Sequence, residues 1–191
     1  MAHLTRYYMY KRISACLKDY GFSPLKGKIL GISGLDNIKS LIDLREAFLT
    51  RADFPGIDMQ RLPYPENNFD VVISDQVIEH LEDPKKAIQE SLRVLKPSGI
   101  MIHTTCFINY LHPAPKDFYR FSCDALMYLC RGSAKIIQCE GWGNRLAILV
   151  CFLSNRLRFK QIPETKWNIL NFLAVYKEEK YPIVTWVIAI K

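Results

Sequence analysis

This chain of 191 residues lacks several features that mark particular classes of protein. It has no Gly-x-Gly-x-x-Gly segment, which disfavours a dinucleotide-dependent dehydrogenase. None of its six cysteines forms a Cys-x-x-Cys pair or a zinc-binding spacing, so we expect buried reduced thiols, a cytoplasmic location and no bound metal. The N-terminus lacks the apolar segment of a signal peptide, and no apolar run is long enough to cross a bilayer.

The composition is that of a globular chain rather than a disordered one. Hydrophobic residues make up 49% of the sequence, enough to bury a core, and the length fits a single domain over residues 1–191. The 26 basic and 19 acidic residues give a formal net charge of +7. This charge favours acidic partners, but a diffuse excess of this size does not by itself predict nucleic-acid binding.

Strand-like and helix-like segments alternate along the chain. The predicted strands are the short apolar runs at 28–32, 46–51, 70–74, 99–105, 134–139 and 182–190. The predicted helices cover 2–20, 36–45, 84–95, a segment that opens at Ser122, 144–157 and 165–176. Such alternation predicts an α/β fold, with a mostly parallel sheet and helices on both faces. The last two strands fit an antiparallel terminal hairpin.

The most informative segment runs from Leu62 to Pro84 and reads LPYPENNFDVVISDQVIEHLEDP. A loop rich in turn residues leads into a buried strand and then into polar residues at the strand's end. Asp83 followed by Pro84 is typical of a helix start. Further along, VLKPSG at 94–99 ends that helix and leads into another strand. Ligands bind at the carboxyl ends of strands in open α/β sheets, so this order predicts a binding site.

The sequence of these two segments closely resembles the class I S-adenosylmethionine-dependent methyltransferases, in particular the type 11 methyltransferase family. The resemblance is ordered over residues 28–121 and most specific over 62–99. It implies a Rossmann-like, seven-stranded sheet. The span from Ile32 to Asp70 is too short for the usual two helices and two strands. We therefore expect the sheet to be shortened between the first and central strands, with one helix and an edge strand missing.

The resemblance also implies S-adenosylmethionine as the cofactor and suggests how the domain is divided. Residues 1–24 would form an N-terminal helix and loop, 25–121 the cofactor-binding core, and 122–191 a C-terminal part that completes the sheet. The oligomeric state is not predicted by these patterns.

The turn after the first strand departs from the family pattern. The family has an acidic residue followed by a glycine-rich loop there, because glycines let the backbone approach the cofactor closely. In this chain Gly31 stands at the acidic position, and Ser33 and Leu35 replace glycines, so that Gly34 is the one loop glycine left. We interpret Gly31, Ser33 and Gly34 as candidate cofactor contacts, with a plain tight turn as the alternative.

Loop aspartates and a polar strand end supply further candidate cofactor contacts. By the resemblance, Asp53 accepts the ribose hydroxyls, and Asp58 accepts the adenine amino group with Met59 packed against the adenine face. The alternatives are a solvated loop residue for Asp53 and a turn residue for Asp58. Asp75 and Gln76, at the carboxyl end of the central strand, are predicted to line the same pocket.

A loop stiffened by prolines, HPAPKDFYRF, begins at His112. Type 11 relatives often have a His-Pro…Asp-Phe-x-Arg-Phe segment here. We interpret His112 as a candidate base for a hydroxyl acceptor and Asp117 as its assistant. His80, Tyr119 and Arg120 are candidate substrate contacts. The alternatives are an ion pair of Asp117 with Arg120 that only fixes the loop, and a supporting rather than catalytic histidine at position 80.

These features together predict a methyltransferase whose acceptor is a hydroxyl of a small molecule, a sugar or a lipid-linked glycan. The altered glycine loop leaves open a catalytically inactive scaffold with the same fold. The net charge leaves open an RNA methyltransferase, although no RNA-binding module is visible. The basic cluster after the helix predicted at 144–157 allows peripheral contact with anionic lipid, with a solvated helix end as the alternative.

Overall fold

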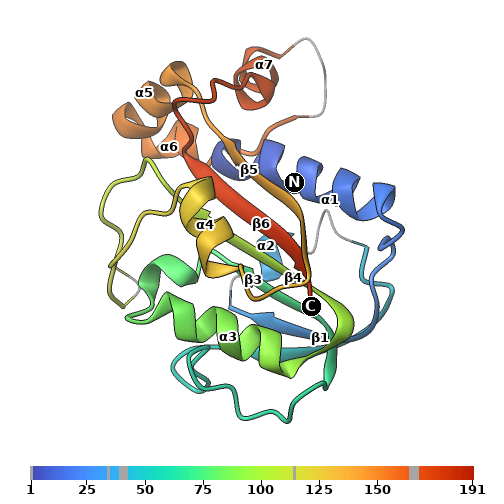
Figure 1. Ribbon diagram of the computed structural model, residues 1–191. Helices are drawn as coiled ribbons and strands as arrows, with labels where there is room; N and C mark the ends of the chain where they lie inside the picture. The colour runs from blue at the N-terminus through green and yellow to red at the C-terminus, as the bar shows by residue number, and fades with distance from the viewer. Residues whose placement is uncertain (1, 34, 39–42, 114, 164–167) are drawn as a thin grey trace.

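The computed structural model describes all residues except 1, 34, 39–42, 114 and 164–167. Within these residues the centre of the molecule is a six-stranded sheet of order β2-β1-β3-β4-β6-β5 (Figure 1). The strands are β1 (Lys26–Ile32), β2 (Glu46–Ala52), β3 (Phe69–Asp75), β4 (Leu95–Cys106), β5 (Lys135–Trp142) and β6 (Val184–Ile190). The pairs formed by β1 to β4 are parallel, and β6 runs antiparallel to both β4 and β5. The predicted sheet is therefore confirmed.

Helices cover both faces of this sheet, as predicted. The described ones are α1 (Leu4–Asp19), α2 (Leu35–Ile38), α3 (Pro84–Val94), α4 (Cys123–Leu129), α5 (Arg145–Leu153), α6 (Asn155–Arg158) and α7 (Ile169–Val175), with a 3-10 turn η1 (Ile78–His80). Apolar side chains of α1, α5 and α7 pack on one face, and those of α3 and α4 pack on the other. Figure 1 shows α5, α6 and α7 gathered at one end of the molecule. Among the described residues, no helix is long and apolar enough to cross a membrane.

Two predicted helices differ from the observed ones. The helix predicted at 36–45 does not extend over residues 43–45, which lie outside any helix, and its described part is α2. The helix predicted at 144–157 is divided at Ser154, whose hydroxyl accepts the N–H of Leu157 and begins α6. Residues 39–42 and the first part of the helix predicted at 165–176 lie outside the described residues.

The sheet is shortened where the sequence predicted it. In the described chain between β1 and β3 the regular elements are α2 and β2, and β2 forms the edge of the sheet. The strand order reverses at β1, since β2 lies on one side of it and β3 on the other.

Strand β3 runs through the centre and is buried along most of its length. Successive side chains of a strand point to opposite faces, so Ile73 packs with α1 and Val72 packs with α3. Burial of each such aliphatic side chain contributes about 1.5–3 kcal/mol. This packing fixes the strand and, with it, the positions of Asp75 and Gln76 at its carboxyl end.

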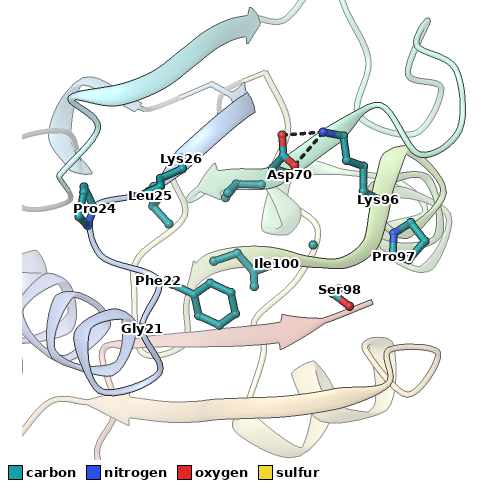
Figure 2. Close-up of a pocket in the computed structure, with 12 residues that line it drawn as sticks. Gly21, Phe22, Pro24, Leu25, Lys26, Asp70, Lys96, Pro97, Ser98 and Ile100 are labelled. Carbon is teal, nitrogen blue, oxygen red and sulfur yellow. Dashed lines mark hydrogen bonds and ion pairs between the residues drawn. The ribbon is translucent and has the colours of Figure 1, made fainter.

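At the amino end of β3, Asp70 joins three strands. Its Oδ2 accepts the backbone N–H of Lys28 at 2.8 Å, and Nζ of Lys96 lies 2.8 and 2.9 Å from its two carboxylate oxygens. Figure 2 shows this ion pair beside a cavity of about 250 Å³. The contacts give Asp70 a structural role at the end of the sheet opposite the candidate site.

Candidate functional site

The carboxyl ends of β1 and β3 open into a cavity at the point where the strand order reverses. Open α/β sheets bind their ligands at such a switch point. The volume of about 480 Å³ lies within the range of roughly 300–1,000 Å³ found for small-molecule pockets. Its lining residues are Ser33, Phe54, Asp58, Gln60, Asp75, Gln76, Val77, His80, Leu81, Glu82, Pro115 and Lys116.

Gln76 presents an unused acceptor beside this cavity. Its backbone N–H donates to the carbonyl of Thr104, and its Nε2 donates to Oγ1 of Thr104, both at 3.0 Å. Its Oε1 is buried and has no hydrogen-bond partner. An unpaired buried acceptor costs about 1–3 kcal/mol, which a ligand with an N–H or O–H donor would remove. The ammonium group and ribose hydroxyls of S-adenosylmethionine are such donors, so this residue fits the cofactor.

The side chain of Asp75 is already engaged by the protein. Its Oδ2 accepts the hydroxyl of Tyr10 and its Oδ1 accepts the hydroxyl of Thr104, each at 2.5 Å. Burial, and after it the charge of Asp75, raises the pKa of Tyr10, so the phenol stays protonated and donates. Asp75 lines the cavity as predicted, yet its carboxylate is a link between α1 and β3. No pattern in the sequence indicates the contribution of Tyr10.

The turn after β1 explains why the acidic residue of the family is missing. A side chain at Gly31 would occupy the space filled by Leu35, which is buried. Ser33 has a φ of 42° in the left-handed region, where glycine is the usual residue, and it lines the cavity. Gly34 lies outside the described residues. The unusual sequence of this turn is thus a packing arrangement, with Leu35 filling the space beside Gly31.

The three predicted residues of the next loop lie in different surroundings. Asp58 lines the cavity, and its Oδ1 accepts the backbone N–H of Gln60 at 2.8 Å. Asp53 follows β2 directly and is exposed, without contacting the cavity. Met59 is buried in the core with α3 rather than in the cavity lining. Phe54, the residue after Asp53, lines the cavity and is 57% exposed. The sequence did not predict this contact.

The loop after β4 is held against η1 by the backbone of Glu79. The carbonyl of Glu79 accepts the N–H groups of Phe118 and Tyr119 at 2.9 and 3.2 Å. The hydroxyl of Tyr119 donates to the carbonyl of Glu82 at 3.1 Å. These contacts bring the loop beside the cavity. Glu82, which follows η1, and Lys116, which belongs to the loop, both line the cavity.

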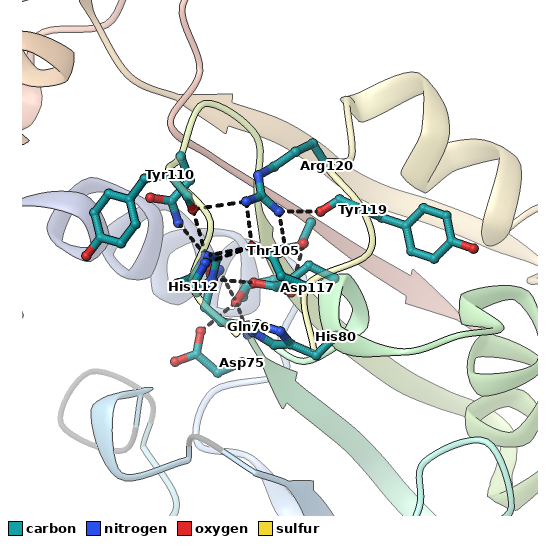
Figure 3. A network of polar contacts seen from close by, with 12 residues as sticks. Asp75, Gln76, His80, Thr105, Tyr110, His112, Asp117, Tyr119 and Arg120 are labelled. Atoms are coloured by element: carbon teal, nitrogen blue, oxygen red, sulfur yellow. Dashed lines mark hydrogen bonds and ion pairs between the residues drawn. The ribbon is translucent and has the colours of Figure 1, made fainter. Parts of the chain in front are cut away.

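Asp117 and Arg120 form an ion pair that fixes the loop, which the sequence allowed as the alternative to a catalytic role for Asp117. The guanidinium of Arg120 donates to both carboxylate oxygens at 2.5 and 2.7 Å, and the backbone N–H of His112 donates to Asp117 at 2.9 Å (Figure 3). The hydrogen bonds from Arg120 are the main reason that the pKa of Asp117 lies well below its usual range. Arg120 also donates to the carbonyl of Tyr110 at 3.0 Å, so its guanidinium is engaged within the loop.

Two histidines meet in this network, with their ring centres 5.0 Å apart (Figure 3). Nδ1 of His80 lies 2.6 Å from the carbonyl oxygen of Lys116. Nδ1 of His112 lies 3.0 Å from the carbonyl oxygen of Tyr110, its shortest polar contact. Carbonyl oxygens only accept, so we assign the proton of each neutral ring to Nδ1. Each Nε2 then carries a lone pair.

Glu79, which precedes His80 in the sequence, completes the group. Its side chain is fully buried, and its Oε2 accepts the hydroxyl of Thr105 at 2.9 Å. Its Oε1 has no hydrogen-bond partner and lies 4.0 Å from Nε2 of His112. Burial raises the pKa of this carboxyl group.

Comparison with known proteins supports the family that the sequence resembles. A family model described as a methyltransferase domain matches residues 15–103. A probable S-adenosylmethionine-dependent methyltransferase of Mycolicibacterium smegmatis is 32% identical over 92 residues, which are 48% of this chain and 36% of that protein. The chain therefore spans about a third of the length of this curated relative.

Solved structures share the fold. An S-adenosylmethionine-dependent methyltransferase from Archaeoglobus fulgidus superposes with a TM-score of 0.56 at 13% identity, covering 97% of each chain. A Haemonchus contortus phosphoethanolamine N-methyltransferase bound to S-adenosylhomocysteine gives a TM-score of 0.60 at 15% identity, covering 94% of this chain and 52% of that one. At these identities the likeness concerns the fold.

Proposed function

Because the chain belongs to the type 11 family of class I S-adenosylmethionine-dependent methyltransferases, we propose that it methylates a hydroxyl group of a small-molecule, sugar or lipid-linked glycan acceptor. The observation that supports this best is the cavity at the switch point of the sheet, where Gln76 offers a buried acceptor without a partner. When bound there, S-adenosylmethionine supplies an electrophilic methyl group on its sulfonium.

The binding roles follow from the positions around the cavity. Oε1 of Gln76 accepts a donor of the cofactor, and the carboxylate of Asp58 accepts the adenine amino group. Asp53 lies directly after β2 and accepts the ribose hydroxyls of a cofactor that extends from the cavity to the end of this strand. Phe54 packs its exposed ring against the same ligand. Such positioning supplies much of the rate, because methyl transfer requires only an in-line approach of the acceptor.

The proposal of a hydroxyl acceptor depends on the loop after β4. A hydroxyl loses its proton during methylation, and Nε2 of His112 offers a lone pair to receive it. The ring is oriented by the carbonyl of Tyr110, and the backbone N–H of His112 is held by Asp117. Asp117 is therefore a positioning residue in this proposal, and Arg120 holds it in place.

Exposed apolar side chains support keeping lipid-linked acceptors among the candidates. Leu149 and Phe152 of α5 and Phe172 of α7 are all more than half exposed. Arg158, by contrast, is buried and donates to Asn109 at 2.7 Å, so it is not part of a solvated basic helix end. An apolar surface of this kind is what a peripheral contact with lipid requires.

Transfer of a labelled methyl group from S-adenosylmethionine tests the proposal. The acceptor panel contains free sugars, nucleotide-linked sugars and lipid-linked glycans, with an RNA mixture as the comparison. We expect methyl ethers on a sugar or other hydroxyl, with S-adenosylhomocysteine formed in equal amount. Methylation of RNA, or of carbon or nitrogen atoms alone, would contradict the hydroxyl assignment.

A further inference from the structure

Three side chains from two separate segments converge beside the cavity. One potential ligand atom each of Glu79, His80 and His112 lies within 4.8 Å of the other two. Glu79 and His80 belong to η1, and His112 belongs to the loop after β4. His80 also lines the cavity. Two imidazoles and one carboxylate are the ligand set of several catalytic zinc and non-haem iron sites.

The orientation of both rings suits metal binding. In metal sites the ligating histidine donates its other ring N–H to a carbonyl or carboxylate, which fixes the ring and its tautomer. Nδ1 of His80 donates to the carbonyl of Lys116, and Nδ1 of His112 donates to the carbonyl of Tyr110. Each ring therefore already has the outer contact that a ligand histidine has, with Nε2 left for a cation.

The carboxylate of Glu79 supports a cation site independently of the orientation of the two histidine rings. Its Oε1 is fully buried, has no hydrogen-bond partner and faces Nε2 of His112 at 4.0 Å. Two lone pairs that face each other at this distance are too far apart for a hydrogen bond. A cation between them would satisfy both once the two atoms approach to about 3.4 Å, the separation of tetrahedral ligand atoms about 2.0–2.2 Å from a zinc ion.

We propose that Glu79, His80 and His112 bind a divalent first-row transition cation, for which Zn²⁺ is the natural probe. Oε1 of Glu79 and Nε2 of each histidine are the ligand atoms, and the carbonyls of Lys116 and Tyr110 orient the rings. The sequence predicted no metal, because the two histidines are far apart in the chain and form no known ligand spacing.

A consequence for the reaction rests on the proposed function. Three protein ligands leave a coordination position for another oxygen, as in catalytic zinc sites. A hydroxyl acceptor in that position has a lowered pKa, so the cation would take over the activation that Nε2 of His112 provides in the metal-free protein. The binding of the cation itself is independent of this consequence.

The test uses the full chain after treatment with a chelator and dialysis. Calorimetric titration with Zn²⁺ is expected to show one equivalent bound, and Co²⁺ is expected to give a visible absorption spectrum free of thiolate charge-transfer bands. His80→Gln and His112→Gln should each weaken Zn²⁺ binding by about 100-fold or more. His3→Gln is the matched control, because it removes a histidine outside the cluster and should leave the affinity unchanged.

Two results would overturn the proposal: no binding at millimolar Zn²⁺, or equal affinity in the wild type and both cluster variants. Circular dichroism confirms that each variant is folded, and Glu79→Gln, which keeps the shape of the side chain, serves if a histidine variant fails to fold. S-adenosylhomocysteine binding is measured on the same samples. If this nucleoside binds and Zn²⁺ does not, only the metal site is wrong, whereas the reverse result removes the proposed function and leaves the metal site.

Discussion

Oε1 of Glu79 and Nε2 of His112 face each other at 4.0 Å with no hydrogen bond between them. One residue lies in the turn after β3 and the other in the loop after β4, and the backbone of Glu79 holds that loop in place. Their approach puts a candidate proton acceptor or metal ligand next to the cavity at the switch point of the sheet.

Replacement of Gln76 by glycine should weaken S-adenosylmethionine binding without unfolding the protein. The variant removes the unpaired Oε1 and relieves a φ of 59°, which glycine adopts freely, but it loses the hydrogen bond to Thr104. The loss costs about 1 kcal/mol and is offset by the two gains, so the free energy of unfolding should not fall by more than about 1 kcal/mol. We expect about tenfold weaker binding by calorimetry. Unchanged affinity would remove Gln76 from the cofactor site.

Asp58→Ala and Asp53→Ala should each lower the affinity for S-adenosylmethionine by about 10- to 100-fold, since each removes a charged acceptor of a cofactor hydrogen bond. Both side chains are exposed, so the melting temperature should barely move. Asp19→Ala, an exposed aspartate at the end of α1, is the control. Equal affinity in the control and in both variants would show that these carboxylates do not contact the cofactor.

His112→Ala should lower turnover by about 100-fold or more while S-adenosylhomocysteine binds as in the wild type. The histidine lies in the loop after β4 and is absent from the lining of the cavity in which we place the cofactor. Leu111→Ala, which removes an exposed apolar side chain from the same loop, is the control and should keep most of the activity. Undiminished turnover in His112→Ala would exclude a direct role in activating the acceptor.

The buried His103 should make the protein less stable in mild acid. Burial lowers the pKa of His103 to about 3, and its Nδ1 contacts Oγ of Ser74 at 2.8 Å. The unfolded chain takes up this proton below about pH 6.5 and the folded chain does not, so stability is present above pH 6.5 and falls as the pH drops towards 3. The loss from this residue at pH 5 is about 2 kcal/mol.

Urea unfolding of the wild type and His103→Gln at pH 7 and pH 5 measures this loss. The variant should lose less stability between the two pH values than the wild type, by that amount. Burial also lowers the pKa of His3, to about 4, so part of the pH dependence should persist in the variant. An identical change in both proteins would show that His103 takes up a proton in the folded state.

The sheet and its main helices could be predicted because their signals are local. β3 is a continuous apolar run, and the start of α3 is set by Asp83, which caps the N–H of Lys86. The division of the predicted helix at Ser154 was missed, since a serine inside an apolar helical pattern indicates no break unless its capping bond is seen.

The site was predictable where it follows directly from a strand end. Asp75 and Gln76 lie at the cavity because they end β3, and His80 lies there because η1 follows at once. The hydrogen bond from Tyr10 to Asp75 and the approach of Glu79 to His112 depend on tertiary contacts between distant segments. No spacing in the sequence encodes such contacts.

The central claim is that the cavity at the ends of β1 and β3 binds S-adenosylmethionine although Gly31 and Leu35 replace the usual turn. Calorimetric titration of the purified protein with S-adenosylmethionine and with S-adenosylhomocysteine tests it most directly. The account predicts micromolar binding of both nucleosides, weakened in Gln76→Gly. Absence of binding at millimolar ligand would contradict it and leave a protein that has the methyltransferase fold without its cofactor.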